Sequence, residues 1–91
     1  MYNILIMTNK LEIIKKRIIY RASYRGTKEM DILLSSFVNK YINEFDEKNL
    51  LELENFLNFE DEKILNFYNH NIVEDNIDNN KISKFFRSHK I

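Results

Sequence analysis

The chain contains one glycine, Gly26, and no proline among its 91 residues. Tight β-turns and hairpins depend on these two residue types, because glycine adopts positive φ angles and proline fixes φ within the turn. A β-sandwich or β-barrel needs many such turns, so both folds are disfavoured. Hydrophobic residues make up 44% of the chain, which is enough for a packed core. The sequence therefore predicts an all-α protein, a small bundle of four to five short helices.

The length and residue usage point to one helical domain. A chain this short supports a single hydrophobic core, so we expect one domain over residues 1–91, with its core over about residues 9–70. The pattern leaves open how the C-terminal segment, residues 71–91, joins that core. Cysteine is absent, which excludes disulfides and cysteine-rich zinc sites. No stretch has the pattern of a signal peptide or the length of a membrane span, so we expect a cytoplasmic protein without membrane insertion.

Apolar residues spaced three and four apart mark the first two expected helices. The first covers about residues 10–24, opened by a capping box of Asn9 and Glu12 and closed at Gly26. Thr27 is the expected N-cap of the second helix. The apolar stripe of that second helix consists of Met30, Leu33, Leu34, Phe37, Val38 and Tyr41.

Acidic residues are the expected caps of the remaining helices. Asp46 precedes the third helix, and Asp61 or Glu60 precedes the fourth. The asparagine-rich segment 69–80 predicts a loop, with Asp78 as the cap of a last helix. In that last helix we expect Ile82, Phe85 and Phe86 to face inward and Lys81, Lys84 and Arg87 to face outward.

The net charge of zero conceals three charged regions. Residues 1–28 carry seven basic side chains and one acidic one, residues 29–80 carry thirteen acidic and three basic ones, and residues 81–91 carry four basic ones. Such asymmetry favours an oriented encounter with a charged macromolecule. The basic first helix, with Tyr20 and Tyr24 among its cations, supports one hypothesis, a small nucleic-acid-binding or regulatory helical module. The acidic middle would repel a duplex, so we expect no nucleic acid.

The sequence offers no group of residues suited to catalysis. His70 and His89 have no partner at a metal-binding spacing, so we expect no metal site. Glu52 and Glu54 lie two apart, a spacing that does not bring side chains together on a helix. One glycine excludes the known phosphate-binding loops. We therefore expect a protein that is not an enzyme.

The junction between the first two helices, Arg25-Gly26-Thr27-Lys28-Glu29, has two interpretations. In the first it is structural: Arg25 stabilises the last carbonyls of the first helix, and Glu29 complements the dipole of the second. In the second, Arg25 and Glu29 protrude as a pair of opposite charges on a rigid support, which suits a binding hot spot. The residues alone leave both interpretations open.

At this junction the sequence resembles the succinate dehydrogenase FAD-assembly factors, small helical proteins with an R-G-x-x-E motif. The resemblance spans about residues 18–70, and the tail from residue 71 matches poorly. The family commonly has a proline in the acidic turn and a tryptophan on the fourth helix, where this chain has Glu62 or Lys63 and Phe67. Beyond the motif, the matching residues are Met30, Asp31, Leu34, Phe37, Leu53, Phe56, Leu57, Asp61, Ile64, Leu65 and Phe67.

The resemblance implies an assembly chaperone. Such factors bind the flavoprotein subunit of succinate dehydrogenase, or in some bacteria that of fumarate reductase, and promote covalent attachment of FAD to a histidine of that subunit. FAD belongs to the partner, so the resemblance implies no cofactor of the chain's own. From the helical pattern we expect a monomer when free, and the resemblance implies a location in the cytoplasm of a bacterium or the mitochondrial matrix of a eukaryote.

The resemblance also implies a partner-binding site at the motif. Arg25 and Glu29 would hydrogen-bond to the flavoprotein near its flavin, and Gly26 would allow close approach of the backbone. Arg21, Tyr24 and Asp31 would flank the contact. On this basis we expect Arg25 to be exposed, and its replacement by alanine to change the stability by no more than about 1 kcal/mol.

Overall fold

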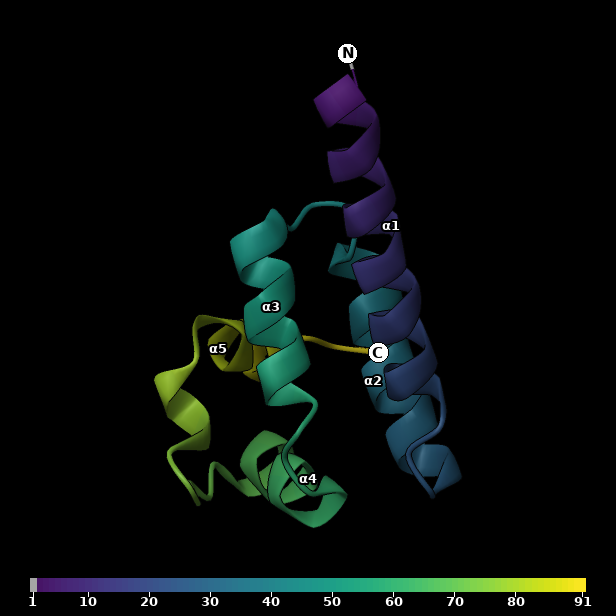
Figure 1. The fold of residues 1–91 in the computed structure, drawn as a ribbon. Helices are drawn as coiled ribbons and strands as arrows, with labels where there is room; N and C mark the ends of the chain where they lie inside the picture. Colours follow the sequence, from purple (N-terminus) through teal and green to yellow (C-terminus); the bar gives the residue numbers. More distant parts are fainter. Residues whose placement is uncertain (1) are drawn as a thin grey trace.

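The computed structural model describes the backbone of residues 2–91 and the side chains of residues 10–91. Over this part of the chain there are five α-helices, one short 3₁₀ helix and no strand, which confirms the all-α prediction (Figure 1). The helices are α1 (Tyr2–Ser23), α2 (Lys28–Tyr41), α3 (Glu47–Phe56), α4 (Asp61–His70), η1 (Ile77–Asn79) and α5 (Lys81–Ser88).

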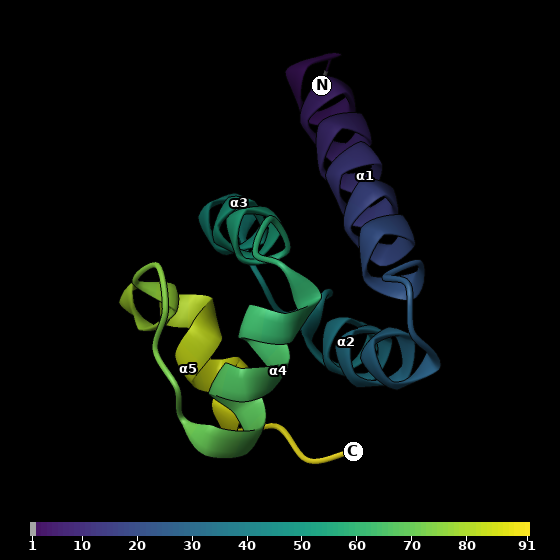
Figure 2. The same cartoon turned by 90° about the horizontal axis from the view of Figure 1, so that it is seen from below.

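The helices pack as a hairpin with a second group of helices against it. α1 and α2 run in opposite directions and are joined by a short turn at residues 24–27 (Figure 1). α3 packs against both α1 and α5, and α4 packs against α5. Seen from below, α1 and α5 lie at opposite sides of the molecule (Figure 2).

The core draws on every helix and includes the C-terminal segment. Ile77, Ile82 and Phe86 are fully buried in the same cluster as the residues of α1–α4. The Phe86 ring lies 5.4 Å from that of Phe37 and 5.1 Å from that of Phe56, between ring centroids. The core therefore extends past the expected limit at residue 70. Its members are Ile14, Ile18, Ala22, Met30, Leu33, Leu34, Phe37, Val38, Ile42, Leu50, Leu53, Phe56, Leu57, Ile64, Phe67, Ile77, Ile82 and Phe86.

The boundaries of α1 differ from the prediction. Its helical backbone begins at Tyr2 and passes through Asn9 and Glu12, so the capping box predicted there is wrong. No glycine or proline interrupts residues 2–9, and helix propagation past a potential cap needs only one hydrogen bond per added residue. α1 ends at Ser23, so Gly26 lies within the turn rather than directly after the helix.

Two of the expected N-caps are confirmed. The Thr27 hydroxyl accepts a hydrogen bond from the Met30 backbone N–H, at 3.2 Å. The Asp46 carboxylate accepts one from the Asn49 backbone N–H, at 2.8 Å. Each side chain satisfies one of the N–H groups that a helix start leaves unpaired.

The N-cap of α4 is one of the two residues predicted, whereas the N-cap of α5 differs from the prediction. Glu60 occupies the N-cap position of α4 but makes no side-chain hydrogen bond there. Asn80, not Asp78, caps α5, with its side-chain oxygen 2.7 Å from the Ile82 nitrogen. Asp78 is taken up by η1, a turn of 3₁₀ helix within the expected loop, and the extended backbone that an N-cap requires falls at Asn80.

His89, near the end of the chain, is buried and packs against the core. Its buried ring contacts the Phe37 and Tyr41 rings, and its Nε2 lies 2.9 Å from the Ser36 hydroxyl. The Tyr68 hydroxyl donates a 2.6 Å hydrogen bond to the His89 carbonyl. Burial lowers the pKa of the His89 imidazole, and the positive charge of Lys40 lowers it further. His89 therefore has a packing role in this structure.

We expect His89 to make stability depend on pH. A lowered folded pKa means that the unfolded chain binds the proton more tightly, so the free energy of unfolding falls as the pH drops below about 6.5. Urea titrations between about pH 7.5 and pH 5 should show this decline for the wild type and for His70→Gln, whose histidine is exposed. His89→Gln should flatten it, and an undiminished slope in that variant would contradict this account.

Candidate partner-binding site

The R-G-x-x-E segment forms the turn between α1 and α2. Gly26 has φ +119°, a backbone conformation that residues with a Cβ rarely adopt. The Arg25 backbone N–H donates a 2.6 Å hydrogen bond to the Asp31 carboxylate, one turn into α2. Thr27 caps the same helix. The turn is therefore tied to α2 at two points and closed by the single residue type that tolerates its geometry.

The Arg25 side chain points inward and holds this turn to the α3–α4 connection. Its Nε donates to Asp61 Oδ1 at 2.9 Å, and its two terminal nitrogens donate to the Leu57 carbonyl at 2.9 Å and the Phe59 carbonyl at 3.0 Å. The side chain is only 10% exposed. The expectation of an exposed Arg25 is therefore wrong, and so is its expected bond to the end of the first helix. The carbonyls that α3 leaves unpaired at its end and the Asp61 carboxylate at the start of α4 together accept more strongly from a guanidinium than the last carbonyls of α1 would.

The outer surface of the turn is open. Gly26, Thr27, Lys28 and Glu29 are all exposed. A Cβ built at Gly26 would meet only the Asp61 carboxylate, at 3.9 Å, so crowding within the chain does not require the glycine. Its φ angle does. Of the expected protruding pair of opposite charges, only Glu29 is exposed, and it lies close to the exposed backbone of Gly26.

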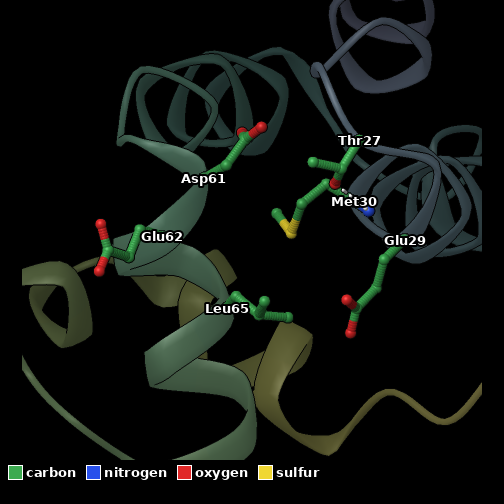
Figure 3. Close-up of a pocket in the computed structure, with 6 residues that line it drawn as sticks. All are labelled: Thr27, Glu29, Met30, Asp61, Glu62 and Leu65. Atoms are coloured by element: carbon green, nitrogen blue, oxygen red, sulfur yellow. Dashed lines mark hydrogen bonds between the residues drawn. The ribbon is translucent and has the colours of Figure 1, made fainter.

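A hollow of about 360 Å³ lies beside Glu29, between the first turns of α2 and α4 (Figure 3). Met30 and Leu65 point into it and give it an apolar floor (Figure 3). Glu29 and Asp61 lie on facing sides, whereas the Glu62 carboxylate points away (Figure 3). The hollow therefore combines an apolar floor with an acidic rim. Its lining residues are Thr27, Glu29, Met30, Asp61, Glu62 and Leu65.

The expected flanking residues divide into two groups. Tyr24 is 71% exposed and lies beside Tyr20, with 4.7 Å between ring centroids. Arg21 instead donates a 2.6 Å hydrogen bond to the Asn58 side chain, and the Asp31 carboxylate accepts the hydrogen bond from the Arg25 backbone N–H. Of the six residues predicted from the resemblance, Tyr24, Gly26 and Glu29 are exposed, and Arg21, Arg25 and Asp31 brace the structure behind them.

Sequence reasoning did not connect Arg25 with its three acceptors. Asp61 was identified only as a helix cap and as part of the matching region, and the Leu57 and Phe59 acceptors are backbone carbonyls that leave no mark in the residue pattern. Met30 was assigned to the apolar stripe of the second helix and Leu65 to the region that matches the family, and nothing in the sequence indicated that the two would line one hollow. Only the acidic turn before α4, opposite a basic motif, hinted at the pairing.

Acidic residues of α3 offset much of the basic face of α1. Arg17 donates two hydrogen bonds to Glu54, at 2.5 and 2.7 Å, which lower the pKa of that carboxyl. Lys10 lies 2.9 Å from Glu47. The charge that suggested a nucleic-acid surface is thus largely engaged within the chain. Among the described residues, no group of three or more histidine and acidic side chains is placed to hold a metal, and no helix is long and apolar enough to cross a membrane.

The fold and this site define a small helical protein that presents a braced, exposed turn. The chain belongs to the family described as the flavinator of succinate dehydrogenase, whose family model matches residues 16–90. The family suggested by the R-G-x-x-E motif is confirmed. The match runs well past residue 70, so the expectation that the tail lies outside the resemblance is wrong.

Curated relatives match a shorter region. The chain is 47% identical over 47 residues to the mitochondrial succinate dehydrogenase assembly factor 2 of Scheffersomyces stipitis, covering 52% of this chain and 32% of that protein. It is 40% identical over 48 residues to the mitochondrial assembly factor 2-A of Drosophila mojavensis, covering 53% and 31%. The matched region is thus about a third of the length of these relatives. No solved structure matches the chain at the same level of significance.

Proposed function

We propose that this chain is an assembly chaperone that binds the flavoprotein subunit of succinate dehydrogenase and promotes covalent attachment of FAD to a histidine of that subunit. The family supports a role in the assembly of the enzyme. The finer assignment is carried by the three side-chain hydrogen bonds from Arg25 to Asp61, Leu57 and Phe59, which we call the Arg25 brace. It fixes the family motif in one shape and leaves Gly26 and Glu29 on its outer surface.

A braced turn suits tight binding because little of it has to be ordered when the partner arrives. Ordering a loop on binding costs free energy that a fixed loop has already lost on folding. Gly26 offers a stretch of backbone without a side chain, against which a partner strand or loop can lie closely. Glu29 offers an exposed acceptor beside it. Together these features define a small contact surface of fixed geometry.

The neighbouring hollow suits a basic side chain of the flavoprotein. An arginine or lysine would lay its aliphatic stem against Met30 and Leu65 and place its charge near Glu29 and Asp61. Asp61 already accepts a hydrogen bond from Arg25, and it retains a second oxygen, Oδ2, beside Gly26. We therefore assign the hollow to a cation at the edge of the flavoprotein contact.

In this proposal the chain contributes position rather than a reacting group. The flavin and the histidine that bond both belong to the flavoprotein. Binding of the turn would favour the flavoprotein conformation in which those two groups are adjacent, and correct placement alone lowers a reaction barrier by several kcal/mol. We propose that the factor acts as a monomer, in the bacterial cytoplasm or, in a eukaryote, in the mitochondrial matrix.

Glu29→Ala should weaken binding of the purified flavoprotein by about tenfold, since truncation of a hot-spot residue costs more than 1 kcal/mol. The variant should lose less than about 1 kcal/mol of stability, because the exposed Glu29 side chain makes no hydrogen bond or ion pair within the described residues and only its interaction with the α2 dipole is removed. Calorimetric titration measures the affinity. Glu44→Ala, at an exposed acid beyond the far end of α2, is the matched control and should bind normally. Equal affinities for the Glu29 and Glu44 variants would contradict the assignment.

A further inference from the structure

An aromatic cluster reaches the surface where α5 meets the end of α2. The Tyr41 and Phe45 rings are stacked, with 6.0 Å between centroids. Phe85 lies 5.9 Å from the first and 6.1 Å from the second. Phe85 was expected to face inward, but it is 44% exposed, because the inward positions of α5 are taken by Ile82 and Phe86. The cluster thus presents an aromatic face to solvent.

Lysines surround this face. Lys81 and Lys84 line a hollow of about 330 Å³ together with Phe85 and Ser88. From α2, the Lys40 ammonium lies 5.4 Å from the centroid of the Tyr41 ring. None of these three lysines lies within ion-pair distance of a carboxylate in the described part of the chain. We call this surface the α5 patch, defined as Tyr41, Phe45, Lys81, Lys84, Phe85 and Ser88.

The unpaired charge of the α5 patch contrasts with α1, where Lys10 and Arg17 are matched to acids of α3. The field of Lys40 also reaches the buried His89 and helps to lower its pKa. The lysines of this surface are therefore not paired with carboxylates of the described residues, unlike these two cations of α1. The patch lies near the C-terminal end of α2, whereas the R-G-x-x-E turn lies at its N-terminal end. The 14 residues of α2 separate the two surfaces by about 20 Å.

We propose that the α5 patch is a second docking surface, which binds a short acidic segment of a partner protein. The lysines would pair with carboxylates, and an apolar side chain of the segment would enter the hollow against Phe85. This surface is separate from the turn assigned to the flavoprotein contact. It would act as an independent point of attachment on the other end of α2.

The dimensions favour a peptide over other anionic partners. α5 has eight residues and is about 12 Å long, which matches three or four residues of an extended chain. A nucleic acid following the patch would run onto acidic neighbours, since α3 packs against α5 and η1 joins it to the acidic pair Glu74 and Asp75. Ile82 and Phe86 of α5 are buried in the core, so Phe85 is the one apolar side chain that this helix could insert into a bilayer, far less than the apolar face of a membrane-binding helix.

The test uses the full ¹⁵N-labelled chain and a synthetic peptide of glutamate and aspartate around one central phenylalanine. We expect saturable binding, with amide shifts concentrated in α5 and around Tyr41 and Phe45. The double variant Lys81→Glu, Lys84→Glu should bind about tenfold more weakly, because two attractions become repulsions. The double variant Lys16→Glu, Lys48→Glu has the same net charge at exposed sites elsewhere and should bind as the wild type does.

A second variant tests the aromatic part. Phe85→Ala should weaken binding about fivefold while leaving the fold intact, because nearly half of this side chain is already exposed. Added salt should weaken peptide binding by the wild type and by Phe85→Ala to the same extent, since salt screens the charges of the lysines and leaves the aromatic contact unchanged. Absence of saturable binding, shifts spread over α1, or equal losses in both lysine double variants would overturn the proposal. Tighter binding of a single-stranded oligonucleotide or of phosphatidylglycerol vesicles than of the peptide would also overturn it.

Discussion

Replacement of Arg25 by alanine should lower the free energy of unfolding by about 3 kcal/mol, a large share of the 5–15 kcal/mol typical of a domain. The variant removes three hydrogen bonds from a charged donor at once. It leaves the Leu57 and Phe59 carbonyls without this partner and the Asp61 carboxylate without its counter-charge. Stranding buried or half-buried acceptors costs more than the net value of the bonds themselves. Denaturant unfolding monitored by far-ultraviolet circular dichroism measures the loss.

Two further variants make this test specific. Arg87→Ala removes an exposed arginine that only lies over the Phe67 ring, so it should cost less than about 1 kcal/mol. Arg25→Lys keeps the charge but loses the planar fork that reaches three acceptors in different directions, so it should fall between the wild type and Arg25→Ala. If Arg25→Ala costs no more than Arg87→Ala, the Arg25 side chain is exposed in solution and the brace does not exist.

The brace changes how variants of the motif are interpreted. A loss of function in Arg25→Ala follows from a turn that is no longer held, even if the guanidinium never touches the flavoprotein. Glu29 is different, because its side chain is exposed and makes no bond within the described residues. Effects at Glu29 therefore report on the partner contact, and effects at Arg25 report first on the shape of the turn.

The helices and most of the core followed from local signals in the sequence. The stripe from Met30 to Tyr41 predicted α2, and Thr27 and Asp46 marked helix starts because a cap bonds to a backbone N–H only a few residues away. Contacts of this kind join residues a few positions apart, so they can be predicted from the local sequence. The resemblance to the family was also readable along the sequence, from the five consecutive residues of the R-G-x-x-E motif together with the matching residues at their spacing over about residues 18–70.

Contacts between distant residues were not predictable in this way. The acceptors of Arg25 lie 32 to 36 residues along the chain, and two of them are carbonyls that any residue provides. The orientation of Phe85 depended on which of two adjacent phenylalanines would face Phe37 and Phe56, and helical period alone does not decide between neighbours. Residues 71–91 join the core through Ile77, Ile82 and Phe86, and of these Ile77 gave no local signal, because it is an isolated apolar residue within a polar segment.

Gly26→Val should reduce covalent flavinylation most strongly, because it damages both features of the turn. A β-branched side chain at φ +119° is strained, which destabilises the turn, and its methyl groups would stand where the partner backbone approaches. Glu29→Ala should also reduce flavinylation, but on an undisturbed fold. We expect a decrease of about tenfold for Gly26→Val and about fivefold for Glu29→Ala, with no decrease for Glu44→Ala.

The most direct measurement is in-gel flavin fluorescence of the denatured succinate dehydrogenase flavoprotein, taken from cells that lack their own factor and express one variant each. Immunoblots of both proteins would normalise the signal to the amounts of flavoprotein and factor. The account predicts strong fluorescence with the wild type and with Glu44→Ala, and weak fluorescence with Gly26→Val, with Glu29→Ala and without any factor. Full fluorescence without a factor, or with both motif variants, would contradict it.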